Sequence, residues 1–172
     1  MFRLTLLVAV LGLAAGCSNQ PKSADVTDAT EKSLKDAGLK DVTVSQDRSK
    51  GIVTIGGHVD SKEDKDRAES LAKAAAGGQV VANEVGVQPA PFAKVAKEVS
   101  ADQDAAINKN LDAAFKSAGL TGVKHKTKNG VVILTGKVAA SATRTQAELA
   151  AAQIPNVQQV VNEIQTTSGE SR

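Results

Sequence analysis

The phrase GIVTIGGHV, residues 51–59, returns almost unchanged as GVVILTGKV at residues 130–138. Aligned at an offset of 79, the two stretches share their first glycine, an inner valine, a second glycine and the closing valine. In both stretches apolar residues stand at alternate positions and would share one face, which predicts a half-buried β-strand. A repeat at a fixed offset indicates that the chain contains two copies of one structural unit.

The likeness continues beyond these two strands. At the same offset an alanine-rich segment and an Asn-Glu pair also repeat: Ala68, Glu69, Ala72, Asn83 and Glu84 match Ala147, Glu148, Ala151, Asn162 and Glu163. Upstream, DAGLKDV at 36–42 matches SAGLTGV at 117–123 at an offset of 81, so the first copy has two extra residues in the intervening turn. An insertion confined to a turn supports the alignment.

Within each copy the spacing of apolar residues changes from helical to alternating and back. Leu34 and Ala37, like Ile107, Leu111 and Phe115, are spaced as on one face of a helix that a glycine ends. A hairpin of two strands, an alanine-faced helix and a last strand follow. We therefore expect an α+β fold with two tandem αββαβ units, each a small three-stranded mixed sheet with two helices packed on one face.

Two details of this fold are also predicted. Gly57 and Gly136 lie in the inward register of a strand, where the missing side chain allows close helix packing or a bulge. Because these glycines stand within a strand and do not open a helix, they do not make a phosphate-binding loop. Ser100 and Gln103 form a capping box that would begin the first helix of the second copy.

The composition permits only a thin core. The chain of 172 residues has no Trp or Tyr and only three Phe, so Val, Ile, Leu and Ala must fill the interior. Units of about 65 to 70 residues are close to the size at which a core alone gives little stability. We expect the two copies to contact each other.

The N-terminus has the features of an export signal. Residues 1–16 combine a basic head with an apolar run of 13 residues, which is too short to span a bilayer. The only cysteine, Cys17, follows directly, and LAAGC resembles a bacterial lipobox, which implies cleavage before Cys17 and its acylation. An ordinary signal peptide followed by a lone cysteine is the alternative. By the same resemblance, Ser18 implies sorting to the outer membrane.

The repeated phrases, the alanine-rich second helix and the endings VANEV (81–85) and VVNEI (160–164) together resemble the BON domain, named for bacterial OsmY and nodulation proteins. The resemblance implies BON domains at 25–88 and 100–167, with a signal peptide at 1–16, a tether at 17–24, a linker at 89–99 and a tail at 168–172. It further implies a non-catalytic envelope protein that binds phospholipid and supports envelope integrity.

Charge divides unevenly between the copies. Residues 22–89 carry a net charge of −2 and residues 90–172 a net charge of +3. In VKHKTK (123–128), alternation places Lys124, Lys126 and Lys128 on the solvent face, and Lys137 of the neighbouring strand points the same way. This row suits anionic phospholipid, and the alternative is a solvated face that discourages edge pairing. No aromatic residue interleaves these lysines, which argues against nucleic acid.

Groups for catalysis or metal binding are scarce in the sequence. His58 and His125 stand in different copies, and no zinc ligand set can be assembled around them. His125 falls on the inward register near a sheet edge. The carboxylates of residues 60–67 begin a helix, where negative charge is favourable, and a cation site is the alternative. We therefore expect no enzyme, no cofactor and no metal.

The linker adds one candidate residue. Pro89 and Pro91 break the last strand of the first copy, and Phe92, Val95 and Val99 then follow at helical spacing. We expect Phe92 to make a buried interdomain contact, with a membrane anchor as the alternative.

These inferences combine into one functional hypothesis. The sequence predicts a lipid-anchored outer-membrane protein on the periplasmic side that binds anionic phospholipids. The alternative is a docking module for another envelope protein or for peptidoglycan, without lipid recognition.

Overall fold

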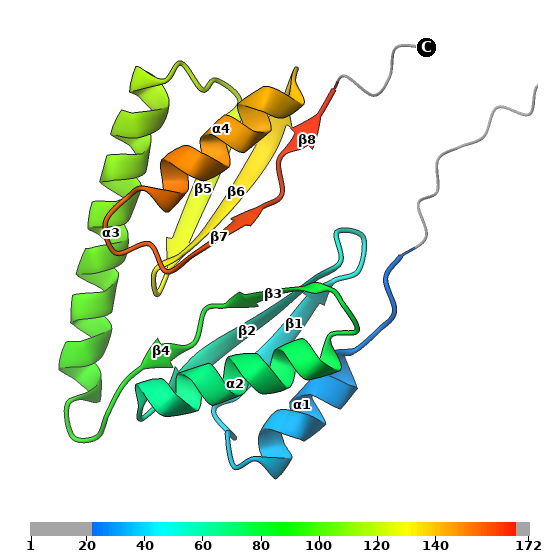
Figure 1. Ribbon diagram of the computed structural model, residues 1–172. Coiled ribbons are helices and arrows are strands. Elements are labelled where there is room, and N and C mark those ends of the chain that lie inside the picture. The colour runs from blue at the N-terminus through cyan, green and yellow to red at the C-terminus, as the bar shows by residue number, and fades with distance from the viewer. Residues whose placement is uncertain (1–21, 168–172) are drawn as a thin grey trace, which may run out of the picture.

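The computed structural model describes residues 22–167. The predictions for the signal peptide, Cys17 and the tail lie outside these residues. The first copy contains α1 (Thr27–Asp36), β1 (Val42–Asp47), β2 (Ile52–Val59), α2 (Lys62–Ala75), β3 (Val80–Asn83) and β4 (Gly86–Val87). The second contains α3 (Ala93–Ser117), β5 (Val123–Lys128), β6 (Val131–Val138), α4 (Ser141–Ala152), β7 (Gln159–Asn162) and β8 (Gln165–Thr166), in the same order (Figure 1).

Each copy forms one mixed sheet around its central strand. β2 lies antiparallel to β1 and parallel to both β3 and β4, and β6 has the same relation to β5, β7 and β8. β3 and β4 are two pieces of one last strand, interrupted at Glu84 and Val85. The expected α+β fold with two tandem αββαβ units is confirmed.

The core of each copy lies between its sheet and its two helices. In the first copy Val53 and Ile55 of β2 are fully buried in one cluster with Leu34 of α1 and Ala72 of α2. In the second copy Val132 and Leu134 lie in a cluster with Leu111 and Ala151. Alanine on the inner face of α2 and α4 lets these helices lie close to the sheet, which offsets the shortage of aromatic residues.

The Asn-Glu pair interrupts the last strand in both copies. The Asn83 carboxamide accepts a hydrogen bond from the Val85 N–H at 3.2 Å and donates to the Glu69 carboxylate of α2 at 3.0 Å. Asn162 makes the equivalent bonds to Ile164 and Glu148 at 3.1 and 2.9 Å. The repeated Asn and the repeated helical Glu therefore join the last strand to the second helix.

The repeated glycine of the central strand is required by a close backbone approach. Gly57 has a φ of +89° and Gly136 a φ of +125°, and residues with a side chain rarely adopt such backbone angles. A Cβ on Gly57 would lie 2.0 Å from the carbonyl oxygen of Asp41, and one on Gly136 equally close to that of Gly122. The neighbouring chain before β1 or β5, and not a helix, occupies the space that the glycine leaves.

The first helix of the second copy begins earlier than expected. α3 runs without a break for 25 residues from Ala93, so most of the expected linker is helical. The predicted capping box is wrong, because Ser100 and Gln103 lie inside α3. The C-terminal part of α3 buries Ile107, Leu111 and Phe115 in the second core, whereas its N-terminal part extends beside β4 of the first copy (Figure 1).

The two copies meet edge to edge, with β3 facing β7 (Figure 1). Ile52 and Ala82 of the first copy form a small apolar cluster with Val131 and Val161 of the second. Each hairpin turn also reaches the Asn-Glu pair of the other copy: Lys50 pairs with Glu163, and Asn129 Nδ2 donates to the Glu84 carbonyl at 2.7 Å. These reciprocal contacts give the interface approximate twofold symmetry and confirm that the copies touch.

Candidate functional site

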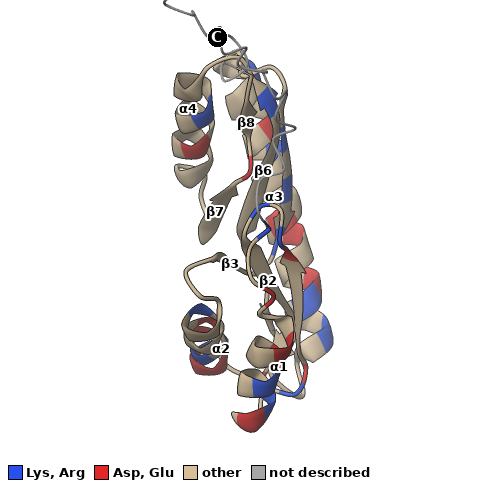
Figure 2. Ribbon diagram, turned by 90° about the vertical axis from the view of Figure 1, so that its right-hand side faces the viewer, with Lys and Arg blue, Asp and Glu red and all other residues tan. Residues whose placement is uncertain are grey.

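The sheet face of the second copy that points away from α4 carries exposed lysines. Along β5, Val123, His125 and Thr127 are half-buried while the lysines between them are exposed. Lys137 of β6 is exposed as well. Lys124 lies opposite Thr135, and Lys126 lies opposite Ile133. Figure 2 shows blue Lys and Arg positions along the strands of the second copy, which lie beside α4.

Lys128 differs from the other three lysines because it belongs to the contact between the copies. Its Nζ lies 3.2 Å from the carboxylate of Glu84, whose side chain is only 9% exposed. In the described part of the chain no ion pair engages Lys124, Lys126 or Lys137. The structure therefore separates Lys128 from a site formed by the other three, which we call the lysine face.

The matching face of the first copy is neutral or acidic. Thr43, Ser45 and Asp47 of β1 are exposed there. The Asp47 carboxylate is 3.4 Å from Lys50. Burial opposes ionisation of Asp47, but hydrogen bonds from Lys50 and Ser49 and the charge of Lys50 together outweigh it and lower the Asp47 pKa. On β1 the first copy therefore has no row of exposed lysines like that on β5.

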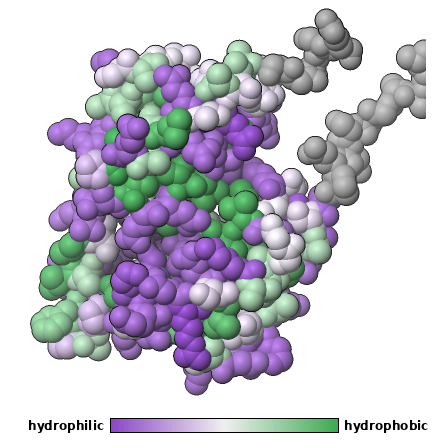
Figure 3. All heavy atoms as spheres, in the orientation of Figure 1, coloured by the Kyte–Doolittle hydropathy of each residue, from purple (hydrophilic) through white to green (hydrophobic). Residues whose placement is uncertain are grey.

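Phe92 is not a buried interdomain contact. Its side chain is 65% exposed, so that part of the linker prediction is wrong. Val95 and Val99 are 57% and 49% exposed, and helical spacing places them on the same side of the helix start as Phe92. Figure 3 shows apolar residues at its lower left, over the N-terminal part of α3. We call Phe92, Val95 and Val99 the α3 stripe.

The two histidines occupy different surroundings. His58 is exposed on β2. His125 is half-buried against α3, where its ring nitrogens lie 3.2 Å from Asn108 Oδ1 and 3.0 Å from Asp112 Oδ1. Its ring meets Phe115 edge-on, with the centroids 5.7 Å apart. His125 is thus part of the contact between β5 and α3, on the inward register as the sequence predicted.

The acidic start of α2 is explained by helix capping and ion pairs. The Ser61 hydroxyl accepts from the Asp64 N–H at 3.1 Å, and Lys62 pairs with Asp66 at 2.6 Å. Within residues 22–167 no group of three or more His, Cys, Asp or Glu side chains is arranged to hold a metal ion. No helix in this range has the length and apolar content needed to cross a bilayer.

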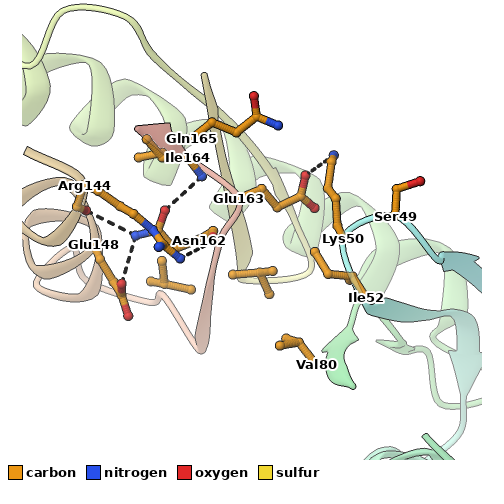
Figure 4. Close-up of a pocket in the computed structure, with 12 residues that line it drawn as sticks. Ser49, Lys50, Ile52, Val80, Arg144, Glu148, Asn162, Glu163, Ile164 and Gln165 are labelled. Carbon is orange, nitrogen blue, oxygen red and sulfur yellow. Dashed lines mark hydrogen bonds and ion pairs between the residues drawn. The ribbon is translucent and has the colours of Figure 1, made fainter. Parts of the chain in front are cut away.

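A cavity of about 590 Å³ opens where the hairpin turn of the first copy meets β7 of the second. Lys50, Ile52 and Val80 line it from the first copy. Figure 4 shows Arg144, Glu148, Asn162 and Glu163 opposite them. Its counterpart across the approximate twofold axis, between α2 and Gln159, is smaller, about 330 Å³, and includes Lys65.

Lys65 is a buried cation at the contact between the copies that sequence reasoning missed. It is 8% exposed, and its Nζ donates to Gln158 Oε1 of the second copy at 3.2 Å. Burial lowers the pKa of Lys65, against the opposing effect of the Glu69 and Asp66 carboxylates. Its sequence equivalent, Arg144, is exposed. The contact with Gln158 of the second copy is one feature that Lys65 has in addition.

Comparison with known proteins gives a family and two solved structures. The BON domain family model matches residues 22–89 and 101–168. Two structures of CdsD, a structural protein of the type III secretion system of Chlamydia trachomatis, are similar at 15% identity, with TM-scores of 0.33 and 0.34. Both matches cover 81% of this chain but only 63% and 60% of the CdsD chains in those structures, the first of which is the C-terminal domain. No curated protein matches the chain.

Proposed function

Because the chain belongs to the BON-domain family and carries two BON domains in tandem, we propose that it is a non-catalytic, lipid-anchored envelope protein whose second domain binds anionic phospholipid. The observation that carries this proposal is the lysine face. Its three lysines, Lys124, Lys126 and Lys137, are exposed and form no ion pair with any carboxylate in residues 22–167. Each such lysine near an anionic surface contributes about 1 kcal/mol, and the attraction decays within a Debye length.

The α3 stripe provides a second, apolar contact for the same surface. Lys94 and Lys97 are exposed beside Phe92, Val95 and Val99. Apolar side chains flanked by lysines are typical of helices that lie in a membrane interface, because the lysine stems reach the headgroups while apolar groups enter the acyl boundary. The exposure of Phe92 therefore supports the membrane-anchor interpretation of this residue.

Acylation of Cys17 would hold both surfaces near the lipid. An extended chain spans at most about 3.3 to 3.6 Å per residue, so the start of α1 at Thr27, ten residues after Cys17, lies within roughly 36 Å of the anchor. Several acyl chains together anchor a protein stably, whereas one chain is marginal. We place the protein on the periplasmic side of the outer membrane.

Sedimentation with vesicles tests the lipid site. The chain from residue 18 onward, which keeps every described residue, is mixed with phosphatidylcholine vesicles with and without phosphatidylglycerol. Replacing Lys124, Lys126 and Lys137 with Gln should weaken binding to the anionic vesicles about 100-fold, at about 1 kcal/mol per lysine. Replacing the exposed Lys22, Lys40 and Lys109 with Gln makes the same change in net charge and serves as the control.

The lysine face is ruled out as the lipid site if both triple variants bind equally, or if the unaltered protein does not prefer anionic vesicles. A Val95→Ser and Val99→Ser variant measures the α3 stripe separately, since its loss should weaken binding at high salt as well. Incorporation of a clickable fatty acid in cells, compared with Cys17→Ala, tests the anchor.

Docking to another envelope protein or to peptidoglycan is a second candidate function. The cavity between the copies is the observation that favours it, because it lies apart from the lysine face and is lined by residues of both copies. Crosslinking in cells to one specific protein, without any lipid preference in vitro, would support this candidate over the first.

A further inference from the structure

The two sheet edges that face each other, β3 and β7, differ in how their main-chain groups are satisfied. Gln159 closes the edge of β3: its Oε1 accepts from the Asn83 N–H at 3.1 Å, and its Nε2 donates to the Val81 carbonyl at 2.7 Å. One side-chain carboxamide thus takes the place of a neighbouring strand. The edge of β3 therefore shows that a group with one N–H donor and one carbonyl acceptor fits the main chain at this position of the fold.

The equivalent edge of β7 has no such group. Val80 is the sequence equivalent of Gln159, is 51% exposed, and has no polar atom to offer. Glu163 donates its N–H to Leu134 of β6, so by alternation the Asn162 N–H and the Val160 carbonyl point away from β6. Among the described residues, neither of these two groups has a hydrogen-bond partner.

These groups lie at the wall of the 590 Å³ cavity, which both Val160 and Asn162 line. Ile52, Val80 and Ile164 give the cavity an apolar lining, and Lys50 is already paired with Glu163. Figure 4 shows the β7 side and the Val80 side facing each other across this space. In Figure 3, apolar residues are exposed across the middle of this face, where the copies meet.

From this asymmetry we infer that the edge of β7 binds a short extended peptide. One residue opposite Val161 donates its N–H to the Val160 carbonyl and accepts from the Asn162 N–H, as in a parallel strand pair. Its neighbours place small apolar side chains against Ile52 and Val80. An acyl chain does not fit this site equally well, because it would cover the two polar main-chain groups without satisfying them.

This inference is independent of the lipid contact, since the cavity includes none of the residues of the lysine face. It also does not involve the cysteine anchor. Vesicle binding and peptide binding can therefore succeed or fail separately, and each experiment reports on its own site.

Amide hydrogen exchange in the protein from residue 18 onward tests the premise. The Asn162 N–H should exchange about fivefold faster than the Asn83 N–H, which is held by Gln159, since one hydrogen bond contributes about 1 kcal/mol. Equal protection of the two amides would contradict the open edge and with it the inference.

Titration with the capped peptide acetyl-Val-Ala-Val-methylamide, followed by nuclear magnetic resonance, tests the binding itself. Saturable shifts should appear at the amides of Val161, Asn162 and Glu163, and not at Asn83. Val80→Gln places a carboxamide where Gln159 stands on the other edge, and it should weaken peptide binding at least about tenfold by competing for two hydrogen bonds.

The control for this variant is Val80→Thr, which keeps the shape of the side chain but is too short to reach the β7 edge, and it should bind the peptide as the unaltered protein does. Absence of saturable shifts would mean that water alone fills the cavity and would overturn the proposal. Unchanged binding in Val80→Gln, or shifts of equal size at Asn83, would place the peptide elsewhere and overturn it too.

Discussion

The Asn83 carboxamide donates a hydrogen bond of 3.0 Å to the Glu69 carboxylate, and Asn162 makes the same bond to Glu148 at 2.9 Å in the other copy. Identical residues thus make one contact twice, between the last strand and the second helix. The two contacts differ in burial, because Asn83 is 3% exposed whereas Asn162 is half-buried.

This difference predicts unequal effects of the same substitution. Asn83→Ala removes the bonds to Glu69 and Val85 from a buried site, so we expect it to lower the free energy of unfolding by about 2 to 3 kcal/mol. Asn162→Ala should cost about 1 kcal/mol, because water replaces the lost partners. Urea denaturation measures both values, and equal losses would show that burial does not govern this contact.

The pH dependence of stability should report on Glu69. Burial alone would raise the Glu69 pKa, but hydrogen bonds from Asn83 and Lys73 prevail and lower it below its ordinary 4.5. A carboxyl with a lowered folded pKa stabilises the protein above its unfolded pKa, and this contribution is lost as the pH falls through the folded value. The stability difference between the unaltered protein and Glu69→Gln should therefore be constant above about pH 5 and shrink at lower pH.

Substitution of the strand glycine should be far more damaging than its backbone angle alone implies. Gly57→Ala combines a left-handed φ with a Cβ 2.0 Å from the Asp41 carbonyl oxygen. Gly38 has a similar φ of +84° but nothing within 4 Å of an added Cβ, so Gly38→Ala isolates the cost of the angle. We expect about 1 kcal/mol for Gly38→Ala and more than about 3 kcal/mol for Gly57→Ala. Similar losses in thermal or urea unfolding would refute the close-approach explanation.

The ion pair between Lys50 and Glu163 should couple the two copies. The Glu163 side chain is 9% exposed and that of Lys50 is 41% exposed, so solvent screens the pair only in part. A double-mutant cycle with Lys50→Met and Glu163→Gln should give a coupling of about 1 kcal/mol. The exposed pair of Lys32 and Asp36 within α1 serves as the reference and should give about 0.3 to 0.5 kcal/mol. A coupling no larger than this reference would argue against a stabilising role for the pair at the interface.

The sequence was sufficient for the order and type of the helices and strands within one copy. Alternation and helical spacing found β2, α2 and their equivalents, because the period of buried residues follows directly from strand and helix geometry. The repeat also showed that Gly57 and Gly136 have a structural role. It marked Asn83 and Glu69 as repeated without revealing that they contact each other, since an identity between copies does not say which partners meet.

Features that depend on both copies were beyond the sequence. Lys128 was grouped with Lys124 and Lys126 because all three share one strand face, yet only Lys128 lies close enough to Glu84 to pair with it. The burial of Lys65 by Gln158 has the same origin. The helical spacing of Phe92, Val95 and Val99 predicts a clamp between the copies, but α3 begins directly after Phe92 and leaves its side chain in solvent.

The unbroken course of α3 constrains how a chain of this kind can change in length. Each residue of an α-helix turns the following one by about 100°, and one full turn takes 3.6 residues. A single inserted or deleted residue between Ala93 and the part of α3 that enters the second core would swing one copy around the helix axis and separate β3 from β7. An insertion of a whole turn would restore this angle but would move the two copies about 5.4 Å apart along the helix axis. The length of α3 therefore fixes both the rotation and the spacing of the duplicated halves.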